Sequence, residues 1–143
     1  MNSVVRFIAG GSLFAIALVF GIWMNHIGVV NMTHTFVVNF QNGTTPTSDY
    51  IGTKKEIVAL MKANDKYTIS IETHTGTRGP DVSNMELSER RRDFMIKEFR
   101  AFKDRVSGEA FGETQPVPRT AHETDTLWQK RLNRAEITVE VGG

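Results

Sequence analysis

Three consecutive arginines, Arg90 to Arg92, are the residues whose chemistry most needs an explanation. A guanidinium group can hold a carboxylate through two parallel hydrogen bonds. Arg91 comes four residues after Leu87 and four before Met95, so helical periodicity places it on an apolar face, and its two neighbours fall about 100° to either side. An arginine within an apolar face extends its charge to water, forms an internal ion pair or binds an anion. Arg91 is therefore the first candidate for a binding residue.

Residues for other kinds of chemistry are few. The chain has no cysteine, which excludes disulfides, thiolate metal sites and cysteine nucleophiles. Its four histidines, at positions 26, 34, 74 and 122, lack the spacing of metal ligands, and the sequence contains no phosphate-binding loop or catalytic-triad motif. The net charge of +1 gives no general electrostatic reason to expect nucleic acid as a partner. We therefore predict a protein that is not an enzyme and that uses no metal or cofactor.

Strands are predicted where apolar residues alternate with polar ones. Three segments have this alternation: HTFVVNF from residue 34, KYTISIET from residue 66 and AEITVEV from residue 135. A shorter strand and a turn are predicted in SGEAFGETQPVP, and the polar segment QNGTTPTS (41–48) is predicted to be a loop.

Helical spacing of apolar residues predicts three helices between these strands. The first follows Ser48 or Asp49, either of which can serve as its N-cap. The second begins at Ser83 and Glu86, which match a capping box, and runs to about Asp104. A third, weaker helix is expected in ETDTLWQKRLN. Strands separated by helices indicate an α+β fold, arranged as an α/β sandwich with helices packed on a mixed sheet.

The first 32 residues differ in composition from the rest of the chain. From Phe7 to Met24 the chain has 18 residues without a charge, and a bilayer core needs about 20 apolar residues in a helix. A cleaved signal peptide is the alternative, but a small-residue cleavage site should then follow, whereas WMNHIGVVNM follows here. We predict a membrane anchor with a short linker in 1–32 and a folded domain in 33–143. Arg6 and the positive N-terminus favour a cytoplasmic N-terminus, with the domain on the far side of the membrane.

Four motifs occur in order along the second part of the chain. They are THTGTRG (73–79), NMELSERR (84–91), EAFGETQP (109–116) and NRAEI (133–137). Together they resemble the signature of the OmpA-like domain, the C-terminal peptidoglycan-binding module shared with Pal and MotB. That signature runs G-H-T-D-x-x-G after a strand, N-x-x-L-S-x-x-R on a helix, then G-x-G-E-x-x-P and N-R-R-V. The resemblance covers about residues 34–141 and implies the fold of that family.

The resemblance also implies a ligand site. In the family, the Asp of H-T-D binds the ammonium group of diaminopimelate in the peptidoglycan stem peptide, and the Arg of L-S-x-x-R binds its carboxylate. This arginine corresponds to Arg91, and the matching motifs add Thr75 and Asn84 as ligand-binding candidates.

Three positions depart from the family signature: Gly76 replaces the Asp, Thr73 replaces the first Gly, and Ala135 replaces the second Arg of N-R-R. Without the loop acid, the site lacks the group that would bind the ammonium of a zwitterion. Asp81, in the same loop, is the preferred substitute, because strand alternation points Glu72 away from the core face.

Two functions fit these residues. The first is an inner-membrane protein with a single membrane span, whose periplasmic OmpA-like domain binds diaminopimelate-type peptidoglycan without a covalent bond, at a site weakened by Gly76. The alternative is a structural accessory subunit of a larger inner-membrane complex, in which the anchor and the domain surface contact other subunits and the cell wall is not bound. Arg91, Asn84 and Gly79 favour the first function, whereas Gly76 and Thr73 favour the second.

We expect the purified protein to keep its N-terminus and to span the membrane once, because the apolar segment is long enough and lacks a cleavage site. N-terminal sequencing of protein extracted from membranes checks this expectation. A mature chain beginning between residues 25 and 33 would contradict it.

Overall fold

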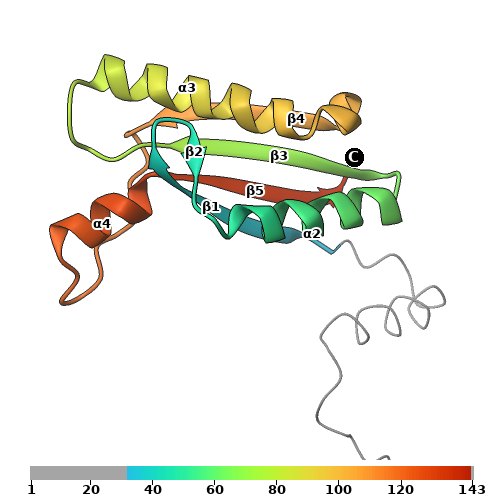
Figure 1. Cartoon of the computed structure of the whole chain (residues 1–143), viewed down its shortest axis with the longest axis horizontal. Coiled ribbons are helices and arrows are strands. Elements are labelled where there is room, and N and C mark those ends of the chain that lie inside the picture. Colours follow the sequence, from blue (N-terminus) through green and yellow to red (C-terminus); the bar gives the residue numbers. More distant parts are fainter. Residues whose placement is uncertain (1–31, 143) are drawn as a thin grey trace, which may run out of the picture. The chain divides into compact units, whose positions relative to one another are not determined.

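The computed structural model describes residues 32–142, which form a five-stranded mixed sheet with helices packed against it (Figure 1). The elements in chain order are β1 (His34–Asn42), β2 (Thr45–Pro46), α2 (Tyr50–Ala63), β3 (Tyr67–His74), α3 (Asp81–Glu98), the 3₁₀ helix η1 (Arg100–Arg105), β4 (Val106–Gly112), α4 (Asp125–Leu132) and β5 (Arg134–Val141). The predicted α+β class, with helices on a mixed sheet, is confirmed for these residues.

The sheet has the strand order β2-β1-β5-β3-β4. Strand β5 pairs antiparallel with both β1 and β3, whereas β4 pairs parallel with β3. A parallel pair needs a long crossover, and α3 supplies it. This crossover returns the chain from the end of β3, so the loop 75–80 and the start of α3 lie at the end of the sheet where β5 begins. Helix α4, which leads into β5, lies at that same end (Figure 1).

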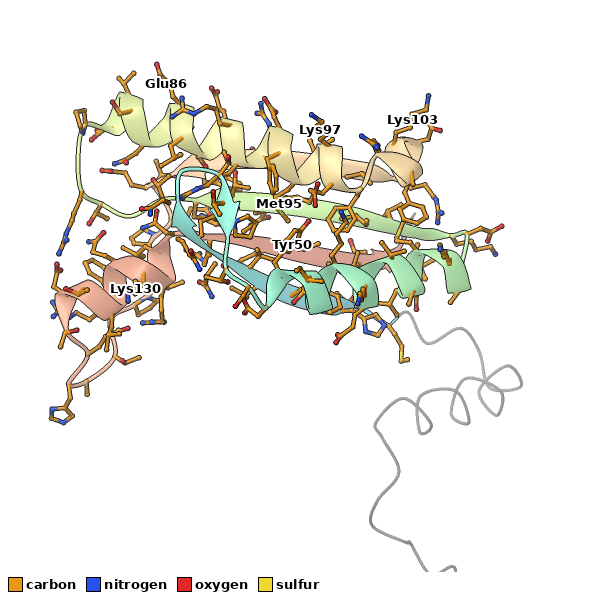
Figure 2. The ribbon with its side chains drawn as sticks, viewed as in Figure 1. Tyr50, Glu86, Met95, Lys97, Lys103 and Lys130 are labelled. Carbon is orange, nitrogen blue, oxygen red and sulfur yellow. The ribbon has the colours of Figure 1, made fainter. Side chains whose placement is uncertain are left out.

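The core lies between one face of the sheet and the two long helices α2 and α3. Alternate strand residues supply the sheet side, as their periodicity predicted, and helical residues supply the other side (Figure 2, in which Met95 points from α3 toward the sheet and Glu86 and Lys97 point away). The buried core residues are Val38, Phe40, Tyr50, Ile57, Met61, Ile69, Ile71, Met95, Phe99, Ala135, Ile137 and Val139. These contacts fix the orientation of α3, and therefore of the arginines on it.

The ends of α3 differ from the prediction. The helix begins at Asp81 with Pro80 at its N-cap, so Ser83 lies inside the first turn and the predicted capping box is wrong. Pro80 takes the extended N-cap conformation, and its carbonyl accepts the first helical hydrogen bond, from the Asn84 amide at 3.0 Å. The helix also ends earlier than predicted, because Phe99 leaves helical geometry and the separate 3₁₀ helix η1 follows.

The predicted loop 41–48 contains the short strand β2, which returns along β1. The turn between them places Gly43 at a φ of +51°, a conformation that glycine adopts without steric cost. Helix α2 then follows Asp49, one of its two predicted N-caps. This hairpin carries the Gly43 carbonyl to the site described below.

The predicted anchor lies outside the described residues. Within residues 32–142, no helix is both long enough and apolar enough to cross a bilayer.

His74, the last residue of β3, is buried with a relative exposure of 1%. Its ring stacks on Phe111 of β4 at 5.5 Å between centroids, and within the described part of the chain neither ring nitrogen has a hydrogen-bond partner. Burial lowers the pKa of His74 to about 4, and the nearby charge of Arg134 acts in the same direction, while Glu136 opposes it. The imidazole is therefore neutral in the folded protein at neutral pH.

This burial makes stability depend on pH. In the unfolded chain His74 gains a proton below its ordinary pKa of 6.5, whereas the folded protein resists protonation down to about 4. The stabilisation is thus fully present above pH 6.5 and is lost as pH falls toward 4. We expect the wild type to lose about 2 kcal/mol more unfolding free energy between about pH 7 and pH 5 than a His74→Phe variant, which keeps the stacking. Denaturant titrations of both proteins at the two pH values test this, and equal losses would contradict it.

Candidate functional site

The three arginines of α3 have different environments. Arg91 is buried, with a relative exposure of 2%, whereas Arg90 is exposed and lies 3.9 Å from Glu86 on the same helix. Arg92 lies at the flank and pairs with the neighbouring Asp93. The prediction that Arg91 alone lies within the buried face is therefore confirmed. Its surroundings must explain how a buried positive charge is stabilised.

The Arg91 guanidinium is held by neutral acceptors from three separate parts of the chain. Its Nε donates to the Gly43 carbonyl at 2.8 Å, and its Nη1 donates to the His74 carbonyl at 2.9 Å and to Asn133 Oδ1 at 3.0 Å. The Phe40 ring lies beneath it, 4.5 Å from the guanidinium carbon to the ring centroid. Within residues 32–142 no carboxylate forms an ion pair with it.

Burial lowers the pKa of Arg91 to about 10, and the positive charge of Arg90 contributes in the same direction. The group still carries its proton at neutral pH. Arg91 is therefore a buried cation whose charge is shared by dipoles and an aromatic ring and is not neutralised by an acid.

Gly76, at the position of the acid in the OmpA-like signature, is buried against Gln129 of α4 and Asn133, the residue that follows this helix. A Cβ placed on Gly76 would lie 2.3 Å from Gln129 Oε1 and 3.0 Å from Asn133 Nδ2. Gln129 is itself fixed, because its Oε1 accepts from the Thr77 amide at 3.1 Å and its Nε2 donates to Thr77 Oγ1 at 2.9 Å. The space beside Gly76 is thus filled by an internal amide.

The other predicted ligand residues are only partly brought together. Thr75 directly follows His74, whose carbonyl Arg91 binds, and it is buried with no described partner for its hydroxyl. Asn84 is buried too, but it donates to the carboxylate of Glu113 and so is already occupied.

The two acids weighed as substitutes lie apart from Arg91. Asp81 is exposed at the start of α3, ten residues before Arg91, which corresponds to roughly 15 Å along the helix. Glu72 is half-buried on β3, between the fully buried Ile71 and Thr73, and so points to the opposite face of the sheet. Neither acid stands beside the guanidinium in this structure.

Gln129 and Asn133 are the site residues that the sequence reasoning missed. Asn133 opens the NRAEI motif and could have been found there. Gln129 belongs to no motif, and its helix was predicted only weakly. The two residues are linked, since Asn133 Nδ2 donates to the Gln129 carbonyl at 2.8 Å.

Thr73, at the position of the first glycine of the OmpA-like signature, forms hydrogen bonds that connect β3 to α3. Its hydroxyl donates to the Ser88 carbonyl at 2.8 Å, and Ser88 Oγ donates to the Thr73 carbonyl at 2.6 Å. Both residues are fully buried. This reciprocal pair fastens α3 to β3 one turn before Arg91 and thereby fixes where the guanidinium points.

We expect Arg91→Ala to lower the unfolding free energy by about 1–3 kcal/mol more than Arg90→Ala or Arg92→Ala, because it removes the donor to the buried His74 carbonyl and the hydrogen bonds to the Gly43 carbonyl and the Asn133 amide. Chemical denaturation of the full chain in mild detergent measures the three variants side by side. Equal losses would show that these hydrogen bonds contribute little.

No family model matches the sequence. Among curated proteins, the outer membrane porin F of Pseudomonas aeruginosa is 31% identical over 90 residues, which is 60% of this chain. The match covers 25% of that porin, so this chain spans about a quarter of its relative's length.

Solved structures are similar over more of the chain. The OmpA-like domain of FopA1 from Francisella tularensis covers 80% of this chain and 77% of its own, with a TM-score of 0.62 and 15% identity. The peptidoglycan-associated lipoprotein of Burkholderia pseudomallei covers 72% and 88%, with a TM-score of 0.58 and 18% identity. The cell wall anchor of the type VI secretion system of Pseudomonas aeruginosa covers 90% and 96%, with a TM-score of 0.61 and 18% identity. The resemblance read from the motifs is confirmed at the level of the fold: residues 34–141 fold as an OmpA-like domain.

Proposed function

We propose that this chain is a membrane-anchored cell-envelope protein whose OmpA-like domain associates weakly and non-covalently with diaminopimelate-type peptidoglycan. Two of the similar structures support this by their descriptions, one as a peptidoglycan-associated lipoprotein and one as a cell wall anchor. The proposal assigns no chemical reaction to the chain.

One observation carries the proposal: Arg91 is a buried cation, and no acid of residues 32–142 stands beside it. A buried charge is costly unless it is paired, so an incoming carboxylate would be favoured there over another neutral acceptor. Nη2 donates to no described residue, which leaves the two N–H groups of this nitrogen for such a ligand. A carboxylate of the stem peptide has the chemistry that this donor requires.

The same geometry explains why the binding should be weak. A zwitterion also presents an ammonium group, and a charge-assisted hydrogen bond to it contributes roughly 1.5–3 kcal/mol. Gly76 cannot form this bond. Asn133 also already shares the positive charge of Arg91, since its side chain accepts from the guanidinium at 3.0 Å, so a carboxylate gains less there than beside a bare cation.

The location follows from the predicted anchor. One membrane span with a cytoplasmic N-terminus would place the domain in the periplasm. The linker from Met24 to Phe36 extends at most about 40 Å, so the domain would lie close to the inner membrane.

The second candidate is a structural accessory subunit of an inner-membrane complex. The filled space beside Gly76 favours it, because neutral amides of Gln129 and Asn133 stand there and no acid is available to bind a ligand's ammonium group. The short linker also favours a role close to the bilayer.

A sacculus pull-down separates the two functions. We expect the full-length protein in mild detergent to be retained weakly, to lose retention when Arg91→Lys removes the planar guanidinium, and to be unaffected by Arg90→Ala. We expect the affinity of the wild type for sacculi to be about 10- to 150-fold lower than that of an OmpA-like domain that keeps the loop acid. No retention of folded wild type would leave the accessory-subunit function, and an extraction in mild detergent would then show whether it leaves the membrane within a defined complex.

A further inference from the structure

We propose that Gln129 is the specificity-determining residue of the Arg91 site: its side-chain amide occupies the place of the loop acid and weakens the binding of diaminopimelate. This inference rests on the proposed ligand class but not on the strength of wild-type binding. It concerns a residue that no motif marks.

The contacts of Gln129 support this role. Its side chain reaches from α4 to the loop after β3, where both amide atoms bond to Thr77, and its relative exposure is 8%. Its Oε1 lies 2.3 Å from where a Cβ on Gly76 would stand, closer than real Cβ contacts come. An acidic side chain at position 76 and the present rotamer of Gln129 therefore cannot coexist.

Asn133 connects Gln129 to Arg91. It accepts from the guanidinium and donates to the backbone carbonyl of Gln129, one helical turn earlier. Hydrogen bonds of the two residues thus run from Thr77 to Arg91. A neutral amide pair also offers no negative charge to an ammonium group, so it disfavours that ligand electrostatically as well as sterically.

The backbone at Gly76 is not the obstacle. Among the described glycines, only Gly43, Gly79 and Gly112 have positive φ, so an aspartate at position 76 meets no left-handed strain. Restoring the acid alone should fail because of Gln129, and removing Gln129 alone should fail because the acid is absent. Only both changes together should reopen the site.

A first measurement needs no ligand. Gly76→Ala introduces the obstructed Cβ, so we expect it to lower the melting temperature of the full chain in mild detergent. The same substitution should cost much less in a Gln129→Ala background. Lys130→Ala, an exposed neighbour on α4 (labelled in Figure 2), is the matched background control and should give no relief. Equal costs in all three backgrounds would overturn the proposed obstruction.

The second measurement uses a soluble disaccharide tripeptide that contains diaminopimelate, titrated into the full-length protein. We expect Gly76→Asp/Gln129→Ala to bind at least about tenfold more tightly than the wild type, with each single variant gaining far less. The double variant should also prefer this ligand over the lysine-containing tripeptide, which lacks the second carboxylate that Arg91 would hold. A merely structural Gln129 would not produce this preference.

Two outcomes would overturn the proposal: Gly76→Asp alone binding as tightly as the double variant, or a folded double variant that gains no affinity. Failure of the proposed function is a separate result, because it appears as wild-type protein that sacculi do not retain. The double variant can gain affinity whether or not the wild type binds the wall.

Discussion

The hydrogen bonds of the buried Arg91 guanidinium connect more of this fold than any other side-chain contact near the site. They join the β1–β2 hairpin at Gly43, the end of β3 at His74 and, at Asn133, the residue between α4 and β5. These three segments are far apart in the sequence and meet at one end of the sheet. One side chain can hold them together because a guanidinium presents several N–H donors in fixed directions.

The neighbouring contacts serve the same arrangement. Thr73 and Ser88 connect α3 to β3 through reciprocal hydrogen bonds. These bonds fix the position of Arg91 relative to the end of β3. His74 stacks its neutral ring on Phe111, and neither ring nitrogen has a hydrogen-bond partner among residues 32–142. The end of β3 thus combines hydrogen bonds that fix α3 with a buried aromatic pair.

The same end of the sheet differs from the OmpA-like signature in its polar groups. The signature has a base on a helix and an acid in a loop. Here the base remains, the acid is a glycine, and an internal glutamine amide fills the space beside it. This difference leaves the fold unaltered, because the sheet and the long helices do not depend on the loop acid.

The sequence by itself determined the fold class, the main strands, the approximate helices and the burial of Arg91, because period-two and period-3.6 patterns of apolar residues report directly which side of an element faces the core. The ordered motifs of the OmpA-like signature pointed to the same architecture. The boundaries of α3 could not be predicted as well as its existence. The helix begins after Pro80 and ends before Phe99 because of the local backbone conformation at these two residues, and not because of the capping pattern at Ser83. The packing of the elements was needed to show which groups accept hydrogen bonds from Arg91 and what fills the space at Gly76. Those groups come from residues 43, 74, 129 and 133, and contacts between segments so distant in sequence depend on how strands and helices pack, which no local pattern of residues encodes.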